Sequence, residues 1–135
     1  MKSIFLVFAV LLVSTANAGQ QYSGDSIQKL YMEMQYLYHV GIEIHQQFPN
    51  TKDRAELKAC TSEHGYISTR AKATVGIANR LDHPDKDEFI NAAWRALNCA
   101  KCSSPMSSCD PLPDDLKNMK NIMAEDYRQQ NLEQE

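Results

Sequence analysis

The sequence predicts an all-α fold, a small disulfide-stapled helical bundle of about four helices. Apolar residues recur at spacings of three and four along most of the chain, as on one face of a helix, and no strand-like alternation occurs. Four cysteines follow a segment that resembles an export signal, and exported thiols usually form disulfides. Prolines followed by acids, at Pro84 and Pro113, mark the starts of new helices.

The N-terminal residues have the features of a signal peptide. Lys2 gives a positive start, residues 4–13 are apolar, and Ala16-Asn17-Ala18 is a small-x-small cleavage signal. The apolar run is too short to span a membrane comfortably. We therefore expect a signal peptide over 1–18 and a single helical domain over 19–135, periplasmic or secreted, without stable membrane insertion after cleavage.

The first helix is predicted to begin at Asp25, after a flexible segment over 19–24, and to end at Pro49-Asn50. Gly41 lies on its apolar face, which predicts that another helix approaches closely there. The residues that define this face are Ile27, Leu30, Tyr31, Met34, Leu37, Tyr38, Gly41, Ile44 and Phe48.

A second helix is predicted over 52–81, with Asn50 or Thr51 as its cap. Gly65 interrupts the pattern, so a break there stays open, although the continuing stripe favours an unbroken or merely kinked helix. The stripe consists of Leu57, Cys60, His64, Ile67, Ala71, Thr74, Ala78 and Leu81.

The third helix is predicted to start at Asp82-His83-Pro84 and to end near Cys99. An irregular segment over 102–113 follows, and a last helix begins at Pro113 and becomes flexible over 129–135. The third helix should bury Phe89, Ile90, Ala93, Trp94 and Leu97, and the last one Leu116, Met119, Ile122, Met123 and Tyr127.

Four cysteines permit three pairings, which sequence alone does not distinguish. We expect Cys60 to pair with Cys99, joining two helices, and Cys102 to pair with Cys109, closing a short loop. The C-x-x-C formed by Cys99 and Cys102 lies at a helix end in a chain without a predicted sheet. Redox-active C-x-x-C motifs usually lie at a helix start, so this position favours structural disulfides.

His39 and Glu43 are the nearest approach to a metal site, since residues four apart share a helix face. His45 should point elsewhere, and further ligands would have to come from another helix. We therefore expect solvated side chains here and no cofactor. The modest net charge of −3, with scattered Lys and Arg, argues against nucleic acid as a partner.

No G-x-S-x-G, S-x-x-K or phosphate-loop pattern is present. Two residues are candidates for partner binding. Tyr36 lies off the apolar stripe, and His64 is either a hydrogen-bonded core or boundary histidine or a pH-sensitive or binding-site group. We expect an exported, non-enzymatic binding protein, such as an inhibitor or immunity-type partner of another periplasmic protein. The alternatives are a carrier of a small apolar ligand, haem or metal between helices, and an enzyme using His64, Glu43 and His39.

Overall fold

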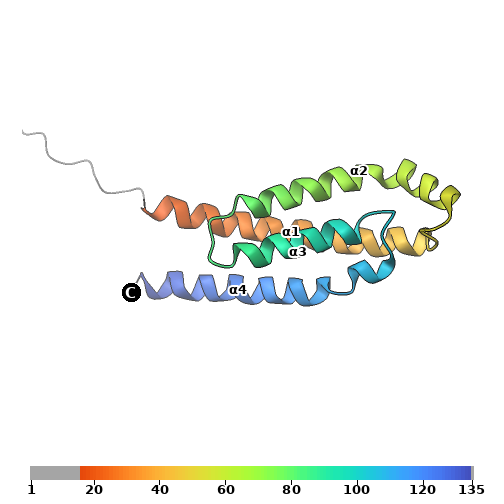
Figure 1. Cartoon of the computed structure of the whole chain (residues 1–135). Coiled ribbons are helices and arrows are strands. Elements are labelled where there is room, and N and C mark those ends of the chain that lie inside the picture. Colours follow the sequence, from red (N-terminus) through yellow and green to blue (C-terminus); the bar gives the residue numbers. More distant parts are fainter. Residues whose placement is uncertain (1–15, 135) are drawn as a thin grey trace, which may run out of the picture.

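The computed structural model describes the backbone of residues 16–134 and the side chains of residue 24 and of residues 26–134. The long helices are α1 (Ala16–Gln47), α2 (Arg54–Asn79), α3 (Lys86–Cys99) and α4 (Leu112–Leu132), and the short 3₁₀ helix η1 (Met106–Cys109) precedes α4. The four long helices run alternately in opposite directions along one axis (Figure 1). The predicted all-α, disulfide-stapled bundle is thereby confirmed.

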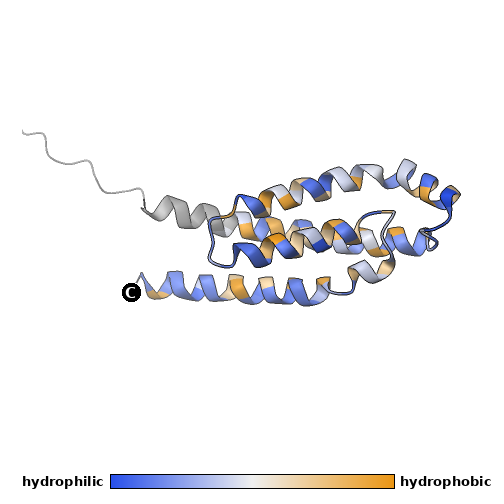
Figure 2. Cartoon of the chain, in the orientation of Figure 1, coloured by the Kyte–Doolittle hydropathy of each residue, from blue (hydrophilic) through white to orange (hydrophobic). Residues whose placement is uncertain are grey.

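Helix α1 contacts α2, α3, α4 and η1, just as α3 contacts each of the other elements. Its predicted apolar face is confirmed: Ile27, Leu30, Met34, Leu37 and Ile44 are fully buried. In Figure 2, hydrophobic and hydrophilic residues alternate along the coloured parts of the helices, as expected of amphipathic helices that pack around one core. The signal peptide over 1–18 and its cleavage after Ala18 remain predictions. Residues 1–15 lie outside the described residues.

At Gly41, α1 and the end of α3 are in close contact. A Cβ atom at this position would overlap Sγ of Cys99 and lie 3.0 Å from the carbonyl oxygen of Cys99. Only the absence of a side chain allows the end of α3 to pack against α1 here. The close approach predicted at Gly41 is therefore confirmed, and the neighbouring element is α3.

Helix α2 is continuous across Gly65, as favoured by the unbroken stripe. Its buried residues are Cys60, Ile67, Ala71, Thr74, Val75 and Ala78. The expected cap at Asn50 or Thr51 is wrong, because Asp53 accepts hydrogen bonds from the backbone amides of Ala55 and Glu56. A carboxylate directly before the first helical residue satisfies these otherwise unpaired amides.

Two other helix starts also differ from the expected ones. Helix α1 already includes Ala16, the first described residue, so the segment 19–24, which was expected to be flexible and to precede the helix, has helical backbone. Helix α3 begins at Lys86, after Pro84, because the His83 side chain accepts a hydrogen bond from the backbone amide of Asp85 and keeps this segment in a turn. Helix α4 extends to Leu132 and so includes part of the segment 129–135, which was expected to be flexible.

All four cysteines form disulfides, as expected, but the expected pairing is wrong. The bonds join Cys60 to Cys102 and Cys99 to Cys109. The Cys99 side chain faces Gly41 of α1 and is fully buried. Helix η1 folds back against α1 and α3 and brings Cys109 to Cys99. Cys102, beyond the end of α3, is then the residue that reaches α2.

Two aromatic residues expected in the core are exposed. Trp94 is 50% exposed, because α3 buries Ala92, Ala93 and Ala96, and residue 94 lies about 160° around the helix from Ala92 and Ala96 and about 100° from Ala93. Tyr127 is 68% exposed. Residues at steps of four advance by about 40° per step on a helix of 3.6 residues per turn. The α4 stripe therefore drifts outward from buried Met119 to exposed Tyr127.

Candidate functional site

A groove between α1 and α4 is lined by several large apolar side chains. It has a volume of about 420 Å³ and includes two side chains that are largely exposed, Met32 (61%) and Tyr127 (68%). We call it the α1–α4 groove. It is lined by Gly24, Ile27, Gln28, Tyr31, Met32, Lys120, Met123, Asp126, Tyr127 and Gln130.

The helix geometry explains why these side chains flank a groove. Tyr31 and Met32 lie beside the buried positions Leu30 and Met34 on α1, and Met123 and Tyr127 lie on the outward-drifting stripe of α4. Of these four side chains, Met32 and Tyr127 stay exposed, whereas Tyr31 and Met123 are half-buried and pack against the core. Large apolar side chains that remain exposed beside each other are typical of an interaction site.

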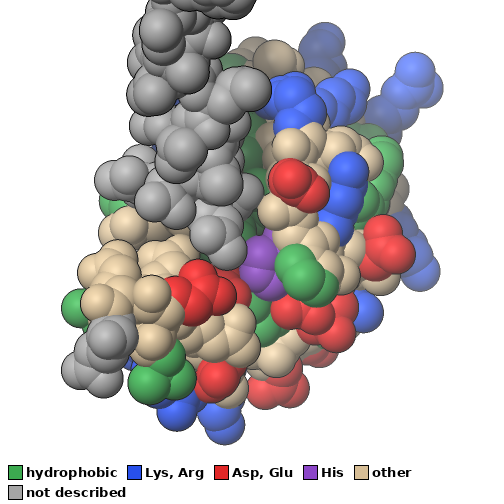
Figure 3. Space-filling model, turned by 90° about the vertical axis from the view of Figure 1, so that its left-hand side faces the viewer, with side chains coloured by type: hydrophobic (Ala, Val, Ile, Leu, Met, Phe, Trp, Pro, Cys, Tyr) green, Lys and Arg blue, Asp and Glu red, His purple; other side chains and the backbone are tan. Residues whose placement is uncertain are grey.

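A second hollow, of about 390 Å³, continues the groove toward the end of the bundle. It shares Gly24, Ile27, Asp126 and Gln130 with the groove, so the two hollows are contiguous. We call it the acidic hollow, because five carboxylate side chains line it: Asp82, Asp85, Glu125, Asp126 and Glu133. Figure 3 views the molecule from this end and shows acidic side chains gathered beside a histidine.

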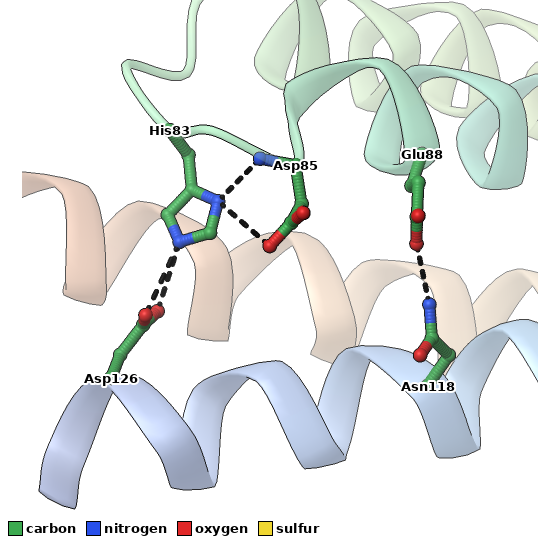
Figure 4. A network of polar contacts seen from close by, with 5 residues as sticks. All are labelled: His83, Asp85, Glu88, Asn118 and Asp126. Carbon is green, nitrogen blue, oxygen red and sulfur yellow. Dashed lines mark hydrogen bonds and ion pairs between the residues drawn. The ribbon is translucent and has the colours of Figure 1, made fainter.

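His83 joins the α2–α3 connection to α4 at this hollow. Its Nδ1 atom accepts a hydrogen bond of 3.0 Å from the backbone amide of Asp85, so the proton is on Nε2, which donates to Asp126 Oδ2 over 3.1 Å. The ring also packs against Phe89, with centroids 5.2 Å apart. Figure 4 shows the imidazole held between the two acidic residues.

This arrangement was not predicted from the sequence. The Asp82-His83-Pro84 segment indicated a helix cap, and the partner Asp126 lies 43 residues away along the chain. No local pattern connects two residues so far apart. The outward position of Tyr127 was recoverable in principle from the 40° drift of its stripe.

Tyr36, the predicted partner anchor, is covered by Arg70 of α2. The guanidinium carbon lies 3.8 Å from the ring centroid, and the same guanidinium donates two hydrogen bonds to the Glu33 carboxylate, of 2.8 and 3.0 Å. The hydrogen bond from Arg70 holds the pKa of Glu33 below its usual value, while partial burial opposes this shift. The half-buried Tyr36 ring therefore joins α1 to α2, and its role as a partner anchor stays a prediction.

His64, the second predicted partner-binding residue, is a half-buried boundary histidine, which was one of its expected positions. Its Nε2 atom lies 3.3 Å from Gln47 Oε1 and 3.3 Å from Glu63 Oε1, and its ring packs edge-on against Phe48. These contacts link α2 to the end of α1, at the opposite end of the bundle from His83. The structure does not bring His64 together with Tyr36.

The weak metal candidates His39 and Glu43 are both exposed. Across the described residues, no group of three or more His, Cys, Asp and Glu side chains could hold a metal ion. His45, which we expected in solvent, is buried and donates from Nε2 to the carbonyl oxygen of Cys99 over 2.9 Å. It satisfies one of the carbonyls left unpaired at the end of α3.

Polar contacts also join α3 to α4. Arg95 donates to Asp115 over 2.6 Å, and Asn118 donates to Glu88 over 2.6 Å, as Figure 4 shows for the second pair. Burial raises the pKa of Asp115, and the charge of Arg95 partly opposes this shift. These contacts hold α4 against α3. Other residues of α4 line the groove.

A search of protein-family models, of curated proteins and of solved structures found no match to this chain. Among the helices in the described part of the chain, none has the length and apolar character needed to cross a membrane. The two disulfides agree with an oxidising compartment.

Proposed function

We propose that this chain is an exported, non-enzymatic binding protein that inhibits or protects another protein of the periplasm through its α1–α4 groove. The observation that carries the proposal is the exposure of Met32 and Tyr127 at one groove, with Tyr31 and Met123 beside them. Tyrosine supplies a large contact area at little entropic cost, and methionine adapts to the shape of a partner.

The hydrogen bond from His83 supports this role, because it joins the α2–α3 connection to Asp126 of α4 beside the groove. The two disulfides lie at the opposite end of the molecule, where they join α2 to the segment after α3 and α3 to η1. A rigid surface loses little conformational entropy on binding, which favours affinity. The helices therefore supply the scaffold, and the groove supplies the contact.

Native mass spectrometry of tagged protein recovered gently from its own compartment tests the proposal. Wild type should carry a second polypeptide, and Tyr127→Glu should lose it because a charge would enter the apolar contact. Tyr66→Glu is the matched control, since Tyr66 is a similarly exposed tyrosine (64%) that does not line the groove. If Tyr127→Glu and Tyr66→Glu carried equal amounts of the second polypeptide, the groove would be overturned as the binding site.

A carrier of a small apolar ligand is the second candidate, because a hollow of about 420 Å³ is within the range that small ligands occupy. The same spectra separate the two functions. A retained small molecule that disappears in Tyr127→Glu, with no second polypeptide, would favour the carrier over the protein-binding role.

A further inference from the structure

We infer that the occupant of the α1–α4 groove is an amphipathic helix of a partner protein that carries Lys or Arg beside its apolar face. This inference rests on the proposed function and names the partner class for the same site. It is drawn from two properties of the groove, its two helical walls and the acidic hollow at its end.

The walls favour a helical occupant. Side chains of two neighbouring helices form ridges, and a third helix packs its own ridges between them. The apolar contacts available are Tyr31 and Met32 on one wall and Met123 and Tyr127 on the other. Apolar side chains spaced by three and four on a partner helix would fall between these walls, as in other helix-in-groove complexes.

The charged residues of the groove and of the acidic hollow indicate which side chains should flank the apolar face of the partner helix. Five carboxylates line the acidic hollow, whereas Lys120 is the cation that lines the groove and Arg128 pairs with Glu125 over 2.6 Å. The excess is negative, so a Lys or Arg that follows the apolar face would meet opposite charge. A partner helix with acidic flanks would meet like charge.

The same charges disfavour a second copy of this chain as the occupant. Two copies joined through this groove by a two-fold axis would place the same surface of each molecule in one interface. The acidic hollow adjoins the groove through Asp126, so both acidic ends would lie beside that interface and repel each other. A basic partner helix avoids this repulsion.

Synthetic peptides test the partner class directly. The first probe is a helix-forming peptide of about 18 residues with leucines at spacings of three and four and lysines at the edges of that face. The second replaces every lysine by glutamate, and the third scrambles the first so that the apolar face is lost. Titration of isotope-labelled full mature protein, followed by NMR, should show binding of the first peptide alone, with shifts at Met32, Met123, Asp126 and Tyr127.

Charge variants test the acidic hollow separately. Glu125→Gln with Glu133→Gln should weaken binding of the lysine peptide by about fivefold, because two rim carboxylates are lost. Lys120→Gln should strengthen binding, because it removes a repelling charge. Glu43→Gln with Asp110→Asn makes the same change in net charge at exposed residues outside both hollows and should leave the affinity unchanged.

The outcomes separate this inference from the proposed function. Equal binding of the lysine and glutamate peptides, or a self-association that the groove variant Tyr127→Glu abolishes, would overturn the basic-helix inference. No binding of the lysine peptide would overturn it as well. The protein-binding role is tested separately, by the comparison of Tyr127→Glu with Tyr66→Glu.

Discussion

At the scale of single residues, two mid-helix glycines have opposite surroundings. A Cβ atom at Gly41 would collide with Cys99, whereas a Cβ atom at Gly65 would meet only a methyl group of Thr61, at 3.8 Å. Glycine in a helix interior is less favourable than alanine by about 1 kcal/mol. Gly65 therefore weakens α2 without a packing benefit, and Gly41 is required by the packing of α3.

Alanine substitutions should consequently change stability in opposite directions. Gly65→Ala should raise the free energy of unfolding by about 0.5–1 kcal/mol, and Gly41→Ala should lower it by about 1–3 kcal/mol. Chemical denaturation of both variants measures the two changes. A Gly41→Ala variant as stable as wild type would show that α1 and α3 are not in close contact at this position.

The Glu33–Arg70 pair should give a measurable pH dependence. The pKa of Glu33 is held below its ordinary value of 4.5, mainly by the hydrogen bond from Arg70. A carboxyl with a lowered folded-state pKa contributes stability above its unfolded-state value, and this contribution is lost as the pH falls through the folded-state value. The pair is partly exposed, so its contribution at pH 7 is about 0.5–1 kcal/mol.

Thermal unfolding of Glu33→Gln against wild type checks this sign. The variant should unfold at a lower temperature at pH 7, and the difference should shrink as the pH falls below 4.5. Glu43→Gln, an exposed substitution on the same helix, should show no such pattern. A difference that grew toward acidic pH would contradict the assigned role of the pair.

At the scale of elements, local periodicity in the sequence was sufficient to predict the helices but not the features that depend on direction in space. The spacing of apolar residues predicted the buried stripes of α1 and α2 and the continuity of α2 across Gly65. The cysteine pairing depended on which way Cys99 faces, and that is fixed by the contact with Gly41. The candidate site was missed for a similar reason, because α1 and α4 are distant in sequence.

The two disulfides should contribute unequally. The Cys60–Cys102 bond spans 42 residues and the Cys99–Cys109 bond spans 10, and a longer closed loop removes more entropy from the unfolded chain. Replacing Cys60 and Cys102 by serine should lower the free energy of unfolding by about 4 kcal/mol, and replacing Cys99 and Cys109 by about 3 kcal/mol.

Peptide mapping without reduction identifies the pairs, and denaturation of the two double variants measures their contributions. Recovery of a fragment linked through Cys60 and Cys99 would contradict the pairing described here. A larger loss of stability from the shorter loop would show that packing around buried Cys99, rather than loop entropy, dominates.

At the scale of the whole molecule, the bundle has two ends with different properties. One end is closed by both disulfides, by η1 and by the hydrogen bond of His45. The other end carries the α1–α4 groove and the acidic hollow, fastened through His83 and Asp126. The disulfides and the proposed binding surface thus lie at opposite ends of the bundle.

Photo-crosslinking in the living cell tests the groove as a binding surface most directly. A photoreactive phenylalanine derivative would replace Tyr127 in the groove or, as the control, the similarly exposed Tyr66 on α2. We predict that position 127 crosslinks to one polypeptide of the same compartment and that position 66 does not. Crosslinks from position 66 alone, or to the same protein from both positions, would contradict the α1–α4 groove as the binding surface.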